Sequence, residues 1–133
     1  MPIREDQVRN IFAALASGQP EKFFEHVADN VNWLVLGTHP LAGEYKSKRE
    51  FREATFAKLT PLFPNGLRLY TREVLVAGDR AAVELYANAT AKSGLRFNNE
   101  YCWICRFAAG RIVDVRAYLD SALVQKLIDS SNQ

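Results

Sequence analysis

Two cysteines, Cys102 and Cys105, are separated by two residues, a spacing that is typical of redox and metal-binding sites. A Cys-x-x-Cys pair can form a redox-active disulfide or supply half of a zinc site. A redox pair needs both sulfurs at the start of a helix, whereas residues 99–107 have the pattern of a β-strand. Side chains three residues apart on a strand point to opposite faces, and the histidines that could complete a zinc site, His26 and His39, are far away in the sequence. We therefore expect two buried strand cysteines and no metal site.

Aromatic side chains with polar ends form a second set of candidates. Tyrosine and tryptophan rings can stack on a flat ligand while their O–H and N–H groups hydrogen-bond it, or they can simply fill an aromatic core. The residues in question are Trp33, Tyr86, Tyr101, Trp103 and Tyr118.

Three charged or titratable side chains could add to such a site. His39 lies in a loop at residues 37–43, where it is either a base or donor at a pocket mouth or an exposed loop histidine. Glu84 and Arg116 are candidate ligand contacts, and the alternative is an internal salt bridge of Arg116 with Glu84 or Asp114.

The elements that must position these residues are helical in the first half of the chain. Apolar residues recur at helical spacing from Val8 to Leu15, and Gly18 and Pro20 end that helix. A shorter helix from Pro20 carries Phe23, Phe24 and Val27, and a buried strand follows at 31–36. Ser47 and Glu50 form a capping box that predicts a third helix at 48–60, with Phe51 and Leu59 turned inward.

The second half of the chain has the pattern of an antiparallel meander. Strands are expected at 67–76, 80–91, 95–107 and 111–119, with glycines in the turns between them. A last helix follows at 121–130 with Asp120 as its N-cap. Helices before and after an antiparallel sheet predict an α+β fold with helices on one face.

Pairing Phe107 with Ile112 across the last turn predicts two unlike faces of the final hairpin. The face that mixes aromatic and hydrogen-bonding groups holds Asn99, Tyr101, Trp103, Cys105, Asp114, Arg116, Tyr118 and Asp120. The other face is apolar, and we expect it to form a homodimer through Ile104, Val113, Val115 and Ala117. The mixed face would then line a small-molecule pocket beneath the helices.

Composition limits the kinds of protein that this chain can be. The 133 residues are 48% hydrophobic and 24% charged, with a net charge of +2, which is typical of one globular domain spanning residues 1–133. The near-balanced charge argues against a nucleic-acid or membrane-surface partner, and no apolar run approaches the ~20 residues of a membrane span. Without a signal-peptide pattern, a cytoplasmic location is expected. No metal or organic cofactor is expected, since there is no ligand cluster or phosphate-binding glycine loop.

The order and spacing of several short motifs resemble the nuclear transport factor 2-like superfamily, in its SnoaL-like and ketosteroid isomerase-like branch. The motifs are residues 12–18 (FAALASG), 37–43 (GTHPLAG), 76–83 (VAGDRAAV), 106–112 (RFAAGRI) and 116–120 (RAYLD). The resemblance implies a cone-shaped barrel, in which a curved sheet of about six strands wraps around three N-terminal helices, with a short C-terminal helix. It also implies a deep apolar pocket and a dimer.

The resemblance also bears on the chemistry. The catalytic base, tyrosine and second acid of ketosteroid isomerases fall on Leu34, Ile11 and Trp103, so that chemistry is not expected. For the second acid of the related epoxide hydrolases, Glu84 is the only candidate in this chain, and its match to their pattern is poor.

Asp120 is where the chain resembles the SnoaL-like cyclases and the epoxide hydrolases, which use an Asp at the end of the last long strand to handle a proton. Burial against Trp103 and Tyr118 would raise the pKa of such a carboxyl toward neutrality. The alternative is a helix cap without chemistry. Our working hypothesis is a protein that binds a small, apolar, cyclic molecule and acts by isomerisation or cyclisation through Asp120. The competing hypothesis is a non-catalytic ligand-binding or dimerisation module.

Overall fold

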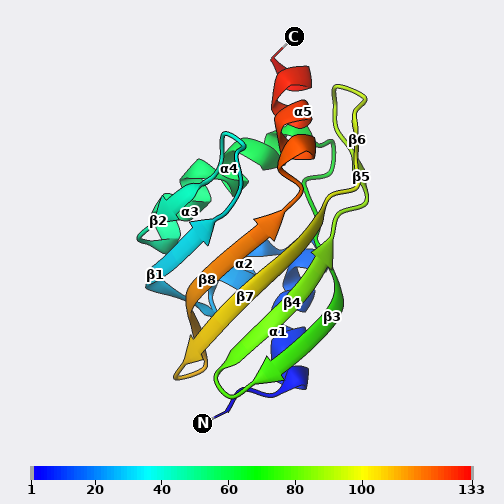
Figure 1. Cartoon of the computed structure of the whole chain (residues 1–133). Coiled ribbons are helices and arrows are strands. Elements are labelled where there is room, and N and C mark those ends of the chain that lie inside the picture. Colours follow the sequence, from blue (N-terminus) through cyan, green and yellow to red (C-terminus); the bar gives the residue numbers. More distant parts are fainter. Residues whose placement is uncertain (1, 133) are drawn as a thin grey trace.

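The computed structural model describes residues 2–132 as a curved, mixed sheet with helices gathered against one face (Figure 1). The strand order is β2-β1-β8-β7-β4-β3, and β1 runs parallel to β8 while the other neighbours are antiparallel. These strands are β1 Val27–Val35, β2 Gly43–Tyr45, β3 Tyr70–Ala77, β4 Arg80–Tyr86, β7 Glu100–Ala108 and β8 Arg111–Leu119. The expected α+β architecture is confirmed, with an open sheet whose edges are β2 and β3 in place of a closed barrel.

The first two helices follow the apolar spacing of the sequence. Helix α1, Glu5–Ala16, buries Val8, Ile11, Phe12 and Leu15 against the sheet, as expected. Helix α2, Pro20–Phe24, starts on a proline and is shorter than predicted. Val27, assigned to this helix from its spacing, instead begins β1, which is therefore longer than the predicted strand at 31–36. None of the helices within residues 2–132 is long and apolar enough to cross a membrane.

The predicted helix at 48–60 is broken into three pieces. Ser47 caps helix α3, Lys48–Ala54, by accepting a hydrogen bond from the Glu50 N–H. At Thr55 the backbone leaves the helical region (φ −122°, ψ −77°), and its hydroxyl donates to the Phe51 carbonyl at 2.7 Å. Helix α4, Phe56–Leu59, and a 3₁₀ turn at Thr60–Leu62 continue in a new direction. The segment thereby bends across one end of the sheet (Figure 1).

Two predicted strands are also interrupted. The segment expected at 80–91 leaves the main sheet after β4 and continues as β5, Ala89–Thr90. The segment expected at 95–107 joins the main sheet only at β7. Strand β5 pairs with β6, Arg96–Phe97, in a separate two-stranded ribbon.

A β-bulge in the last hairpin changes which side chains face the helices. Phe107 pairs with Ile112 as predicted, but the register shifts by one residue between Phe107 and Arg106, which leaves Val113 without a partner. Beyond the bulge, Cys105 pairs with Val115 and Trp103 with Ala117. A one-residue shift moves every following side chain to the other face.

The predicted division of the two faces is therefore wrong for β8. The side chains of Val115 and Ala117 are buried beneath the helices, so they cannot form the expected dimer surface. Asp114, Arg116 and Tyr118 lie instead on the outer face, where Tyr118 is 41% exposed.

The junction between β8 and helix α5, Ser121–Ser131, is held by Asn99. This side chain is fully buried, and its carbonyl oxygen accepts hydrogen bonds from the backbone N–H groups of Glu100 (2.8 Å) and Asp120 (3.1 Å). Its amide nitrogen lies 3.5 Å from the Asp120 carbonyl. Asn99 thus fixes the point at which the chain leaves the sheet and enters α5.

We expect Asn99→Ala to lower the free energy of unfolding by about 1–3 kcal/mol, because it removes a buried side chain that accepts two part-buried backbone hydrogen bonds. The measurement is urea denaturation followed by circular dichroism. Asn98→Ala is the matched control, since Asn98 is exposed and its removal should change stability by no more than about 0.5 kcal/mol. Equal effects of the two variants would contradict the role of Asn99.

Candidate functional site

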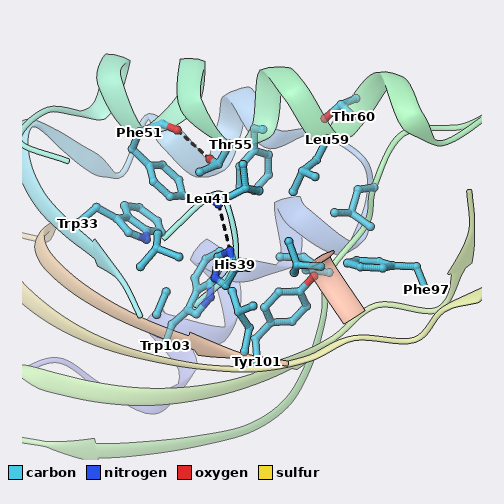
Figure 2. A pocket seen from close by; sticks show the side chains of 17 residues that line it. Trp33, His39, Leu41, Phe51, Thr55, Leu59, Thr60, Phe97, Tyr101 and Trp103 are labelled. Carbon is cyan, nitrogen blue, oxygen red and sulfur yellow. Dashed lines mark hydrogen bonds between the residues drawn. The ribbon is translucent and has the colours of Figure 1, made fainter. Parts of the chain in front are cut away.

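A small cavity of about 50 Å³ lies between the concave face of the sheet and the helices α3, α4 and α5 (Figure 2). Its walls are almost wholly apolar, and no Asp, Glu, Lys or Arg is among the lining residues. These residues are Trp33, Val35, His39, Leu41, Phe51, Thr55, Phe56, Leu59, Thr60, Leu67, Leu69, Phe97, Tyr101, Trp103, Ala117, Leu119 and Val124.

Aromatic contacts hold one wall of the cavity together. The Trp33 ring stacks on Phe51 with centroids 3.8 Å apart, and it meets Trp103 edge-to-face at 5.2 Å. Pockets for drug-sized ligands usually have volumes of about 300–1,000 Å³, so this cavity is small. A ligand larger than a few water molecules therefore needs side chains to move. Phe56 and Leu59 on α4 are the candidates, because both line the cavity and are only partly buried.

Six of the lining residues carry a polar side-chain group, and three of these are Tyr101, Trp33 and Trp103. Burial raises the pKa of the Tyr101 phenol well above its usual value, so the hydroxyl stays protonated at neutral pH. The indole nitrogens of Trp33 and Trp103 are buried and have no hydrogen-bond partner among the described residues. The cavity wall therefore contains no ionised Asp, Glu, Lys or Arg side chain, and the two indole nitrogens are covered by neighbouring atoms.

His39 stabilises the loop at the cavity through hydrogen bonds, and neither ring nitrogen is free to act as a base. The ring is 5% exposed, its Nδ1 accepts from the Leu41 N–H at 3.2 Å, and its Nε2 lies 3.2 Å from the Leu36 carbonyl. Because Nδ1 accepts, Nε2 must carry the proton and donate, which defines a neutral imidazole. Burial lowers the pKa of His39, opposed in part by its hydrogen bond to Leu36, and so favours the same neutral form.

The same loop is docked on the start of α5. A Cβ on Gly37 (φ +122°) would lie 2.1 Å from the Ser121 hydroxyl and 2.9 Å from the His39 ring. The Thr38 N–H lies 3.4 Å from the same hydroxyl. Only glycine fits this close approach and this backbone conformation.

The structure brings four of the predicted site residues together. Trp33, His39, Tyr101 and Trp103 all line the cavity (Figure 2). They reach it from β1, from the loop after β1, and from β7.

The other predicted site residues lie elsewhere. Glu84 and Tyr118 border a shallow depression on the outer face, and Arg116 is exposed on that face. Tyr86 packs against Tyr70 at 5.5 Å, outside the cavity. Asp120 is exposed and caps α5, where its carboxylate accepts from the Leu123 N–H at 3.2 Å. The predicted N-cap is confirmed, whereas burial of Asp120 against Trp103 and Tyr118 is not found.

Several cavity residues were not singled out from the sequence. Thr55 lines the cavity from the break between α3 and α4, Phe97 from β6, and Val124 from α5. Phe51 and Leu59 were expected to turn inward from their helical spacing, and both line the cavity.

The cysteines lie on opposite faces of β7, as predicted. Cys105 is buried and Cys102 is half-buried, and both are free thiols. Burial raises the pKa of both thiols, which disfavours the reactive thiolate. Within residues 2–132, no group of three or more His, Cys, Asp and Glu side chains is placed to hold a metal ion.

Comparisons with known proteins identify the family. The family model described as a SnoaL-like domain matches residues 8–115. An NTF2-like protein from Burkholderia thailandensis is 23% identical, with 92% of this chain and 95% of that chain covered and a TM-score of 0.78. TerC, co-crystallized with polyporic acid, is 19% identical, with 93% and 96% covered and a TM-score of 0.75.

The curated relative is named dimerizing cyclase phiC and comes from a fungal species. It is 23% identical over 130 residues, which are 95% of this chain. The chain spans 57% of the length of that relative. The protein belongs to the SnoaL-like domain family and has the nuclear transport factor 2-like fold.

The neutral state of His39 predicts a pH-dependent stability. Its pKa is lower in the folded than in the unfolded chain, so the unfolded chain binds the proton first as the pH falls below about 6.5. The free energy of unfolding should therefore be highest above that pH and decrease between pH 7.5 and 5.5. Urea denaturation across this range measures it.

His39→Asn should lose this part of the pH dependence and about 1 kcal/mol of stability at pH 7.5. His26→Asn is the matched control, because His26 is exposed and leaves His39 in place. The same pH dependence in wild type and His39→Asn would show that His39 is not buried as the neutral form.

Proposed function

We propose that the protein binds a neutral, largely apolar small molecule in the cavity between the sheet and helices α3 to α5. The observation that carries this proposal is the wall itself, in which aromatic and aliphatic side chains surround a space that no charged side chain lines. Ligand sites of small-molecule-binding proteins have this composition. Co-crystallization of the structurally similar TerC with polyporic acid supports a role in small-molecule binding.

The geometry favours binding without carboxylate chemistry. Neither Asp120 nor Glu84 is among the cavity residues. On β1, the inward side chains on either side of Leu34 are Trp33 and Val35, so this strand presents no carboxylate to the cavity either. His39, the lining residue whose ordinary pKa is nearest neutrality, uses both ring nitrogens to hold its loop.

Cyclisation with proton transfer is the second candidate, supported by the match to dimerizing cyclase phiC. In that function Asp120 would have to leave its capping position and enter the cavity.

The first experiment is a thermal-shift screen with steroids, polyketide-like ketones and terpene epoxides. A ligand at 100 times its dissociation constant should stabilise the fold by about 2.7 kcal/mol. Ala117→Leu adds bulk to the cavity wall and should abolish this stabilisation, at a cost of about 1–3 kcal/mol from overpacking. Ala122→Leu makes the same change at an exposed position and should keep it.

Asp120→Asn separates the two candidate functions. Asparagine caps a helix as well as aspartate does, so stability and ligand binding should stay unchanged. If a ligand is cyclised by wild type and only bound by Asp120→Asn, the second candidate function is correct. A ligand that stabilises Ala117→Leu and wild type equally would exclude the cavity as its site.

We propose in addition that two copies associate through the outer sheet face. Of the apolar residues expected there, Ile104 and Val113 are half-buried. Ile104 and Leu34 share a shallow groove with Arg80, Arg106, Arg116 and Asp114. The apolar centre of this groove, and not the excess of positive charge around it, supports the association of two copies.

Ile104→Glu should convert the dimer to a monomer in light scattering, because it places a charge at the centre of that face. Ile104→Val keeps the centre apolar and should remain a dimer. A wild-type mass of one chain would rule the interface out.

A further inference from the structure

Like charges lie directly opposite each other at two places on the outer face of the sheet. Arg80 on β4 is paired with Arg106 on β7, and Glu84 on β4 is paired with Glu73 on β3. Within residues 2–132, Arg80, Glu73 and Glu84 form no ion pair, and Arg106 has one long contact, to the Asp114 carboxylate at 3.9 Å. Like charges in opposite positions destabilise a sheet, so the single chain leaves both pairs uncompensated.

An apolar row separates the two charged pairs. On β4, Arg80, Ala82 and Glu84 alternate with buried residues and therefore share the outer face. Ala82 is paired with Leu75 on β3 and with Ile104 on β7, so the row crosses three neighbouring strands (Figure 1). Leu75 is 64% exposed, the most exposed of the large apolar side chains within residues 2–132. Along the strands, the outer face is therefore basic, then apolar, then acidic.

This order of charges is complementary to a second copy of the same chain. When two sheets pack face to face with two-fold symmetry, the axis lies in the plane between them. An axis that runs nearly along the apolar row reverses the strand direction, so the basic end of each copy lies over the acidic end of the other. Arg80 and Glu84 are each two residues from Ala82, so Arg80 of each copy would lie opposite the partner's Glu84.

A second copy also accounts for more of the face than a small anion would. Three arginines and one aspartate line the groove around Ile104, so an anion could neutralise the arginines. It would leave Glu73 and Glu84 opposite each other, whereas a second copy supplies charges of both signs. Arg116 lies at the side of the row, where the roughly 30° crossing of packed sheets separates it from the partner's Arg116.

We infer that Arg80 and Glu84 form two reciprocal ion pairs across the two-fold axis of a dimer, and that these pairs set its register and its selectivity for the same chain. This inference rests on the association proposed above, and it names the contacts that align the two copies.

The test reverses one charge in each of two variants and then mixes them. Arg80→Glu alone makes both contacts of the dimer repulsive, and so does Glu84→Arg alone. The dissociation constant of each variant dimer should rise at least about tenfold above that of wild type. In an equal mixture, the two variants should form a heterodimer with about the wild-type dissociation constant, because each contact then joins opposite charges. Native mass spectrometry distinguishes the three dimers by mass.

Loss of folding cannot imitate this result. Within one chain, Arg80→Glu places a carboxylate opposite Arg106, and Glu84→Arg places a guanidinium opposite Glu73. Each variant thus replaces a like-charge pair by an opposite-charge pair, and both should keep the wild-type circular dichroism spectrum. Lys126→Glu is the matched control for the change in net charge. Lys126 is exposed on α5, which does not belong to the outer sheet face, so the wild-type dissociation constant should be kept.

The outcomes separate the ion pairs from the association itself. If the charge variants dimerise as tightly as wild type, or if their mixture does not favour the heterodimer, the ion pairs are wrong. The association through the outer face then still stands if Ile104→Glu dissociates the dimer. If wild type has the mass of one chain, the face is not an interface between copies, and the inference falls with the association.

Discussion

The register of the last hairpin is the constraint on which the candidate site depends. Because Val113 bulges out of the ladder, Val115 and Ala117 turn toward the helices next to Trp103, while Arg116 and Tyr118 turn outward. With regular pairing, a guanidinium and a carboxylate would face the cavity. The bulge therefore makes the interior apolar, and it lies in a central strand pair, next to the turn of the last hairpin.

An apolar interior explains why the aromatic wall is stable and why the cavity has a small volume. Stacked and edge-to-face rings gain about 0.5–1.5 kcal/mol per pair beyond the burial of their surface. Trp33, Phe51 and Trp103 form a connected set of such contacts, so the wall on that side resists rearrangement. The opposite side is built by α4, a single turn that follows the break at Thr55. The cavity is therefore rigid where the indoles lie and more adaptable where Leu59 lies, because Phe56 is held in the same set of ring contacts by Phe24 and Phe51.

Local patterns in the sequence predict most of the fold, because they depend on neighbours along the chain. The apolar stripe of α1, the cap at Ser47 and the turn that pairs Phe107 with Ile112 are all of this kind. The interruption at Thr55 and the bulge at Val113 depend on tertiary packing, which the helical or strand periodicity of a single segment does not contain. Trp33, Tyr101 and Trp103 were predictable as site residues, since they precede or lie apart from the bulge. The predicted placement of Arg116 and Tyr118 failed because a shift of one residue inverts a strand's faces.

The outer face shows how the same shift redistributes charged side chains. Without Val115 and Ala117, the remaining apolar side chains on that face are separated by Arg106, Asp114 and Arg116. Association through it would accordingly depend on matching charges as well as on apolar contact.

The position of both tryptophans in one wall also has an optical consequence. Their rings are 5.2 Å apart and shielded from water, so the tryptophan emission of the protein arises from one closely spaced pair in the cavity wall. Any molecule that enters, or any loosening of α4 that admits water, changes the surroundings of that pair. The protein thus carries a built-in fluorophore at its candidate site.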